Sequence, residues 1–141
     1  MKFWDSSAIV PLLVRQRASA GMRSLLRRDS SQLVWWGTRV ECDSAVARME
    51  REGYLNLQGA EEAFHRLELL AMRWHEVQPV DVLREFARRM LRLHPLRAAD
   101  SLQLAAAFMA AEKRPSTLEF VCLDERLSLA AGREGFVVLP H

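Results

Sequence analysis

Short apolar runs alternate along the chain with segments whose apolar residues recur at helical spacing. The short runs end at Ser, Gly, Pro or an acid, which is typical of buried strands; they are residues 2–4, 33–36, 120–123 and 136–139, with a further short strand around Val77. The helical spacing predicts helices over 18–28, 38–52, 63–74 and 82–91, and the nearly uniform apolar stretch 98–111 predicts a buried helix. Strands alternating with helices indicate an α/β fold with a mainly parallel central sheet.

The ends of these elements carry further signals. Ser6 or Ser7 is expected to cap a helix after the first strand, and Pro11 is expected to kink that helix or delay its start. Gly53 is expected to end the helix that begins at Thr38. A short helix, residues 125–131, is predicted between the last two strands.

Length and composition are those of a globular domain. The 141 residues, half of them hydrophobic and 27% charged, predict a single domain spanning residues 1–141. No apolar run reaches the roughly 18 residues of a membrane span, so we expect no membrane association and a cytoplasmic location. Cys42 and Cys122 lie far apart and outside any metal-ligand spacing, which predicts two free thiols.

The net charge of +2 permits a nucleic-acid partner without establishing one. Nearly all basic residues are arginines, which suit bidentate phosphate binding. A GC-rich genome would give the same bias, and both explanations stay open.

Four acids stand at positions where parallel α/β proteins build their sites. Asp5 and Asp124 follow predicted strands, Glu41 lies in the first turn of the helix after the second strand, and Asp100 enters the most apolar helix near its start. Sites in such sheets form outside the carboxyl ends of the strands. The four carboxylates are therefore expected to converge on one edge of the sheet.

Each acid also has a local explanation. Asp5 and Asp124 could cap the helices that follow them, and Asp100 could favour the positive end of its helix. Thr38-x-x-Glu41 has the spacing of a capping box, in which the Glu41 carboxylate would return to the Thr38 N–H. Asp43, two residues after Glu41, would point about 200° away on a helix and is not expected in the same site.

Gathered carboxylates favour a bound cation. Two unit charges 4 Å apart repel by roughly 4 kcal/mol at an effective dielectric of 20. Oxygen-only ligands select Mg²⁺ or Mn²⁺ over zinc. Such an ion lowers the pKa of an attacking water and neutralises charge on a phosphate, so this pattern favours phosphodiester hydrolysis.

Four segments, in order along the whole chain, resemble the PIN-domain family. Each contains one of the acids, and the first and third are the most specific: Phe3-Trp4-Asp5-Ser6-Ser7-Ala8-Ile9-Val10, Val40-Glu41-Cys42-Asp43-Ser44-Ala45, Leu96-Arg97-Ala98-Ala99-Asp100-Ser101-Leu102-Gln103-Leu104-Ala105 and Val121-Cys122-Leu123-Asp124-Glu125-Arg126-Leu127. The resemblance implies a three-layer sandwich, a central parallel sheet between helices, with an acidic pocket for one or two Mg²⁺ or Mn²⁺ ions.

Single-domain members of this length are mostly VapC toxins, which cleave RNA and are held inactive by a VapB-type antitoxin. The resemblance places Asp5, Glu41, Asp100 and Asp124 at the four metal-binding acids, and Ser6 at a hydroxyl position beside the first acid. Many members have Thr or Ser where this chain has Cys122, and His where it has Gln103. These departures leave the carboxylates intact and put the role of the fourth acid and the substrate preference in question.

These observations predict a metal-dependent endoribonuclease, the toxin of a toxin–antitoxin pair. Arg97, three residues before Asp100, is the candidate for RNA binding, whereas the stripe Arg84, Arg88, Arg92 is expected to be a solvated helix face. The alternatives are a housekeeping PIN nuclease acting on RNA or DNA and an inactive PIN scaffold. A haloacid-dehalogenase phosphatase would need an Asp at the position of Ser7.

The expected partners are an RNA substrate, an antitoxin and a second copy of the chain. An antitoxin arginine could enter the acidic pocket, where a guanidinium can bind carboxylates bidentately. The apolar surface for the antitoxin, or for a homodimer, is expected near Trp35–Trp36 or on the helices at residues 8–28, although both tryptophans could equally belong to the core.

Overall fold

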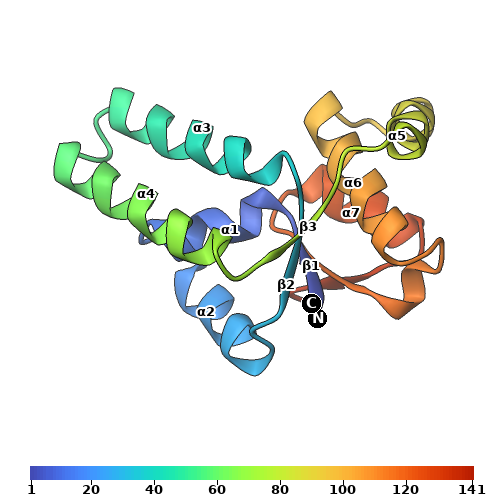
Figure 1. Cartoon of the computed structure of the whole chain (residues 1–141), viewed down its shortest axis with the longest axis horizontal. Helices are drawn as coiled ribbons and strands as arrows, with labels where there is room; N and C mark the ends of the chain where they lie inside the picture. The colour runs from blue at the N-terminus through green and yellow to red at the C-terminus, as the bar shows by residue number, and fades with distance from the viewer.

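The computed structural model describes every residue from Met1 to His141 (Figure 1). It contains five strands, seven α-helices and one short 3₁₀ helix. In chain order they are β1 (Lys2–Trp4), α1 (Ser6–Leu13), α2 (Ser19–Arg28), β2 (Gln32–Trp35), α3 (Thr38–Arg51), α4 (Leu57–Ala71), β3 (His75–Val77), α5 (Asp81–Leu93), α6 (Ala98–Ala110), η1 (Pro115–Thr117), β4 (Glu119–Val121), α7 (Glu125–Arg133) and β5 (Val137–Leu139).

The five strands form one sheet in the order β3-β2-β1-β4-β5, and every neighbouring pair is parallel. The chain builds the sheet outward from β1 to β3 and then crosses to the other side of β1 to add β4 and β5. The order therefore reverses between β1 and β4. The carboxyl ends of those two strands flank the position where open α/β sheets bind ligands.

Helices cover both faces of the sheet, as Figure 1 shows. Neighbouring strand residues point to opposite faces, so Phe3 is buried in one core and Trp4 in the other. The core around Phe3 is completed by α5, α6 and α7, and the core around Trp4 by α1, α2, α3 and α4. The expected three-layer α/β sandwich with a parallel sheet is thus confirmed.

Most predicted elements are present, but the helix predicted over 63–74 begins six residues earlier, at Leu57, and ends three residues earlier, at Ala71. The second strand starts one residue earlier than predicted, at Gln32, and the strand predicted to end at Leu123 ends at Val121. The prediction of a serine cap was wrong: Asp5 caps α1 by accepting from the Ser7 N–H at 3.0 Å. Pro11 lies inside this helix, which begins directly at Ser6 and is therefore not delayed.

Several further features of the structure bear on the sequence analysis. Cys42 and Cys122 are free and buried. No helix combines the length and the apolar character required to cross a bilayer. Arg84 and Arg88 lie on an exposed face of α5 and pair with the acids three residues before them. Of the two tryptophans, Trp35 is in the core and Trp36 is half exposed.

Gly37 makes room for the buried Trp35 indole directly before α3. A Cβ at Gly37 would lie 2.5 Å from Trp35 Nε1, whereas a Cβ at Gly21, within α2, would meet nothing within 4 Å. We expect Gly37→Ala to destabilise the fold by about 1–3 kcal/mol through overpacking. Gly21→Ala, the matched control, should be neutral or stabilising by about 0.4–1 kcal/mol. Urea unfolding of both variants tests this, and equal stabilities would contradict the packing constraint.

Candidate active site

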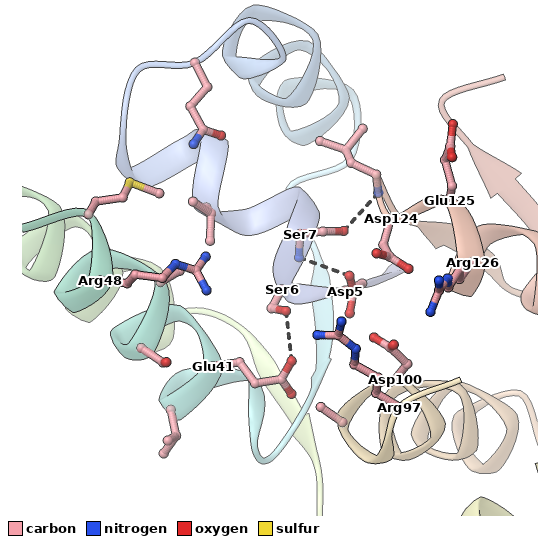
Figure 2. Close-up of a pocket in the computed structure, with 18 residues that line it drawn as sticks. Asp5, Ser6, Ser7, Glu41, Arg48, Arg97, Asp100, Asp124, Glu125 and Arg126 are labelled. Atoms are coloured by element: carbon pink, nitrogen blue, oxygen red, sulfur yellow. Dashed lines mark hydrogen bonds between the residues drawn. The ribbon is translucent and has the colours of Figure 1, made fainter. Parts of the chain in front are cut away.

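All four predicted acids line one pocket of about 1020 Å³ at the carboxyl edge of the sheet (Figure 2). We call it the acid pocket. Its lining comes from α1, α3, α6, the first turn of α7 and the segments next to these helices. It consists of Asp5, Ser6, Ser7, Val10, Gln16, Val40, Glu41, Ser44, Ala45, Arg48, Met49, Arg97, Ala99, Asp100, Leu123, Asp124, Glu125 and Arg126. Asp43 is not among them, as expected from its position on α3.

Asp5 is held at the bottom of the pocket by the sheet itself. Its N–H donates to the Val121 carbonyl at 2.9 Å, which continues the pairing of β1 with β4. The residue is 3% exposed, and its carboxylate accepts from the Ser7 N–H. The local explanation, a helix cap, is therefore correct for Asp5. It does not exclude a site role, because the same carboxylate also lines the pocket.

Glu41 does not form the capping box that its spacing suggested. Gly37 is the N-cap of α3, and no side chain caps this helix end. Instead, the Glu41 carboxylate turns into the pocket, where Oε1 accepts from the Ser6 hydroxyl at 2.9 Å (Figure 2). A hydrogen bond to a distant segment of the chain thus takes the place of the expected bond to the Thr38 N–H.

Gln103 of α6 holds the other oxygen of Glu41. Its side-chain amide donates to Glu41 Oε2 at 3.1 Å and to the Thr38 hydroxyl at 2.9 Å. The Gln103 side chain is fully buried, and its Oε1 has no hydrogen-bond partner. Gln103 thus links α6 to the first turn of α3 and fixes the direction of the Glu41 carboxylate.

Asp100 and Asp124 enter the pocket from the opposite side to Glu41. Asp100 lies in the first turn of α6, and Asp124 caps α7 by accepting from the Leu127 N–H at 2.9 Å. Figure 2 shows both carboxylates directed toward Asp5. Strand β4 ends before Asp124, but Cys122 extends the ladder by one hydrogen bond to Leu139, which brings the acid to the sheet edge.

Burial and mutual repulsion disfavour the charged forms of three of these acids. Burial raises the pKa of Asp5, and the charges of Asp100 and Asp124 raise it further. Burial, followed by the charge of Asp5, raises the pKa of Glu41 to about 7. The pKa of Asp100 is raised by burial and by Asp124, while Arg97 and Arg126 oppose the increase. A cation in the pocket would offset this repulsion and favour the charged carboxylates.

Ser6 and Ser7 of α1, and Cys122 directly after β4, form hydrogen bonds that hold the acids or the segments that carry them. Ser6 binds Glu41, and the Ser7 hydroxyl accepts from the Leu123 N–H at 2.9 Å, tying α1 to the loop that carries Asp124. The Cys122 thiol donates to Asp5 Oδ2 at 3.7 Å. Burial raises the pKa of this thiol to about 12, so Cys122 acts here as a neutral donor and not as a nucleophile.

The sequence prediction missed part of the site. Ser7, Arg48 and Arg126 also line the pocket beside the predicted residues, including Arg97. Arg126 lies two positions after Asp124 and could have been proposed, like Arg97, from its closeness to one of the four acids. Arg48 lies seven residues after Glu41, which is two turns along the same face of α3.

The donor set suits a hard divalent cation. It offers carboxylate oxygens from four separate segments of the chain, and Asp5, Glu41 and Asp100 have raised pKa values. As the side chains stand, no three acidic, histidine or cysteine residues converge closely enough to hold a metal ion. Ion binding would therefore require the side chains to draw together.

Comparison with known proteins gives a likeness of fold. No family model and no curated protein sequence matches this chain. Among solved structures, it is similar to the crystal structure of FitAcB from Neisseria gonorrhoeae, with a TM-score of 0.63 and 21% identical residues over 98% of this chain and 96% of that chain. The match over almost the full length agrees with the PIN-like architecture.

Proposed function

We propose that this chain is a metal-dependent endoribonuclease of the VapC type, the toxin of a toxin–antitoxin pair. The observation that carries the proposal is the convergence of Asp5, Glu41, Asp100 and Asp124 on one pocket at the reversal point of a parallel sheet. The arginines in the same pocket add a reason for an anionic substrate. The resemblance of the four acid segments to PIN domains and the structural likeness to FitAcB support the same class.

In this proposal the four carboxylates would hold Mg²⁺ or Mn²⁺, which would supply an activated water and neutralise charge on the scissile phosphate. Ser6 and Gln103 keep Glu41 directed into the pocket, and Asp5 is fixed by its backbone hydrogen bond to β4. Arg97 and Arg126 bind phosphate oxygens of the RNA, and at the same time they moderate the repulsion around Asp100.

Gln103→Leu tests the positioning of Glu41. The variant keeps the buried volume roughly constant but removes the donor to Glu41 Oε2. We expect the concentration of Mn²⁺ needed for half-maximal RNA cleavage to rise about 10–100-fold, as for other residues that orient metal ligands. Gln32→Leu is the control, because Gln32 is equally buried in β2 but outside the acid pocket. An unchanged Mn²⁺ requirement in Gln103→Leu would contradict the positioning role.

The toxin assignment is tested in a bacterial host. The chain is induced alone, together with the product of the open reading frame next to it, and as Asp100→Asn. The wild-type chain alone should arrest growth, and mapped RNA ends should reveal cleavage that the neighbouring product or Asp100→Asn prevents. The neighbour should also co-purify as an antitoxin, whether the toxin is a monomer or the expected homodimer. Harmless accumulation of the folded chain, with no co-purifying neighbour, would favour a housekeeping PIN nuclease.

A further inference from the structure

A second pocket, of about 350 Å³, lies at the C-terminal end of α1. Three of its seven lining residues are arginines, and none is acidic: Pro11, Leu12, Leu13, Val14, Arg15, Arg23 and Arg66. We call it the arginine pocket. Its three guanidinium groups come from the loop after α1, from α2 and from α4, so the tertiary fold brings them together.

The positive charge of this region is not balanced by acids. Residues 6–28 contain five arginines and no acid, so the rest of the chain carries a net charge of −3 within the total of +2. No carboxylate lies within salt-bridge distance of Arg15, Arg23 or Arg66. Arg84 and Arg88 on α5 behave differently, because each pairs with an acid of its own helix.

One of the three guanidinium groups is held in place. Nη1 of Arg66 donates to the Leu13 carbonyl at 3.0 Å, which fastens α4 to the end of α1. A guanidinium has five N–H donors, so most of those on Arg66 stay available to a ligand. Arg15 and Arg23 make no side-chain hydrogen bond within the protein, and both are exposed. The pocket therefore offers several donors and an uncompensated charge to an anion.

The arginine pocket and the acid pocket border the same end of α1. Val10 and Gln16 line the acid pocket, whereas the intervening residues 11–15 line the arginine pocket. A polyanion held in the acid pocket, with a cation between its phosphate and the carboxylates, could thus continue around α1 to the arginines. A small anion would have no need of the second pocket.

We propose that the arginine pocket binds the phosphate backbone of single-stranded RNA at nucleotides flanking the bond cleaved in the acid pocket; this rests on the proposed ribonuclease function. Guanidinium groups bind phosphate oxygens bidentately, and each phosphate they neutralise releases condensed counterions. The pocket thereby contributes affinity for long substrates that contact both sites, and it contributes none to the chemical step.

The test compares Arg15→Gln/Arg23→Gln with Arg89→Gln/Arg92→Gln. The control pair removes the same charge from α5, on the opposite face of the sheet, where neither arginine forms an ion pair. Binding of two fluorescent oligouridines is measured in chelator at several salt concentrations: one too short to leave the acid pocket and one several times longer. Cleavage of both in Mg²⁺ gives kcat and KM.

For the long RNA, the Arg15/Arg23 variant should bind about tenfold more weakly, with a salt slope lower by about 1.4, which corresponds to two lost phosphate contacts. Its KM for the long RNA should rise similarly, while kcat and the cleavage of the short RNA stay unchanged. An equal loss in the Arg89/Arg92 control, or no loss in either variant, would overturn the arginine pocket as an RNA site and leave the ribonuclease function standing.

Two further outcomes separate the alternatives. If the wild-type chain cleaves no RNA but binds the long RNA through Arg15 and Arg23, the arginine pocket is supported and the nuclease proposal fails. If polyglutamate binds these arginines more tightly than the long RNA does, the pocket is a site for an acidic protein segment, and the RNA proposal is overturned.

Discussion

Asp100→Asn and Asp5→Asn are each expected to reduce divalent-dependent RNA cleavage by more than about 100-fold while the fold persists. Substituting a residue that merely orients a metal ligand already lowers metal affinity or activity by about 10–100-fold, and these two substitutions remove the charge of a ligand itself. Asparagine retains the shape of the acid, and its side-chain oxygen can still accept from the Ser7 N–H that Asp5 now binds. Purified variants are assayed on single-stranded RNA in Mg²⁺ and in Mn²⁺.

Asp43→Asn is the matched control for both variants. It removes one carboxylate charge from α3, two residues from Glu41, yet Asp43 does not line the acid pocket. Its cleavage rate should stay near that of the wild type. Wild-type rates in Asp100→Asn or Asp5→Asn would contradict the assignment of the carboxylates, and an equal loss in Asp43→Asn would show that net charge, not the pocket, sets the rate.

Glu41→Gln is expected to make the metal-free protein more stable at alkaline pH, by an amount on the order of 2 kcal/mol. The pKa of Glu41 is raised from 4.5 to about 7 by burial and by Asp5. Below pH 4.5 the carboxyl is neutral in both the folded and the unfolded chain. As the pH rises through 7, the folded state must accept a charge that it disfavours, so stability is lost across this window. Each unit of pKa difference corresponds to about 1.4 kcal/mol of unfolding free energy. The expected value is smaller than the full difference because solvent screens the partly exposed carboxylate.

The measurement is a series of chemical unfolding curves in chelator between pH 5 and 8. The wild type should lose stability as the pH rises, Glu41→Gln should lose less, and Mg²⁺ or Mn²⁺ should restore the wild type above pH 7 but not the variant. The difference between the two proteins isolates Glu41 from Asp5 and Asp100, whose raised pKa values act in the same direction. If Glu41→Gln is the less stable protein in chelator at pH 8, the carboxylate stabilises the fold and the ligand interpretation fails.

The sequence predicted the order of elements and the position of the acids because both depend on local pattern. The short apolar runs bounded by turn residues or acids formed strands, and Asp5, directly after the first of them, lies at the sheet edge. A different signal, the nearly uniform apolar stretch 98–111, placed Asp100 at the start of the buried α6. Because β1 and β4 pair in parallel, their carboxyl ends lie at the same edge of the sheet, and the acids that follow them lie close together.

Local rules failed where contacts between distant segments decide the outcome. Thr38-x-x-Glu41 has the spacing of a capping box, but Ser6 and Gln103, 35 and 62 residues away in sequence, bind the Glu41 carboxylate instead. No spacing within α3 could have shown this. Similarly, Leu123 was predicted to lie in a strand because it is apolar, whereas its N–H is satisfied by the Ser7 hydroxyl rather than by a neighbouring strand.

The arginines also show that composition gives the charge of the chain, whereas the fold decides where that charge lies. Composition permitted an anionic polymer as a partner, and the sequence already separated Arg97 from the stripe on α5, but only the fold reveals the group at Arg15, Arg23 and Arg66. Arg84 and Arg88 neutralise acids on α5, Arg97 lines the acid pocket, and Arg15 and Arg23 line a second pocket without acids. The functional distinction lies in which arginines line a pocket, because Arg89 and Arg92 also lack an ion pair but line neither pocket.

The central claim is that carboxylates in the acid pocket use a divalent ion to hydrolyse RNA by attack of water. The most direct measurement is the cleavage of a defined single-stranded RNA by the purified wild-type chain, with Mg²⁺ and with chelator, followed by analysis of the product ends. The account predicts cleavage that requires the ion and leaves no 2′,3′-cyclic phosphate, because water rather than the RNA 2′-hydroxyl attacks. Cleavage that persists in chelator and produces 2′,3′-cyclic phosphate ends would contradict it.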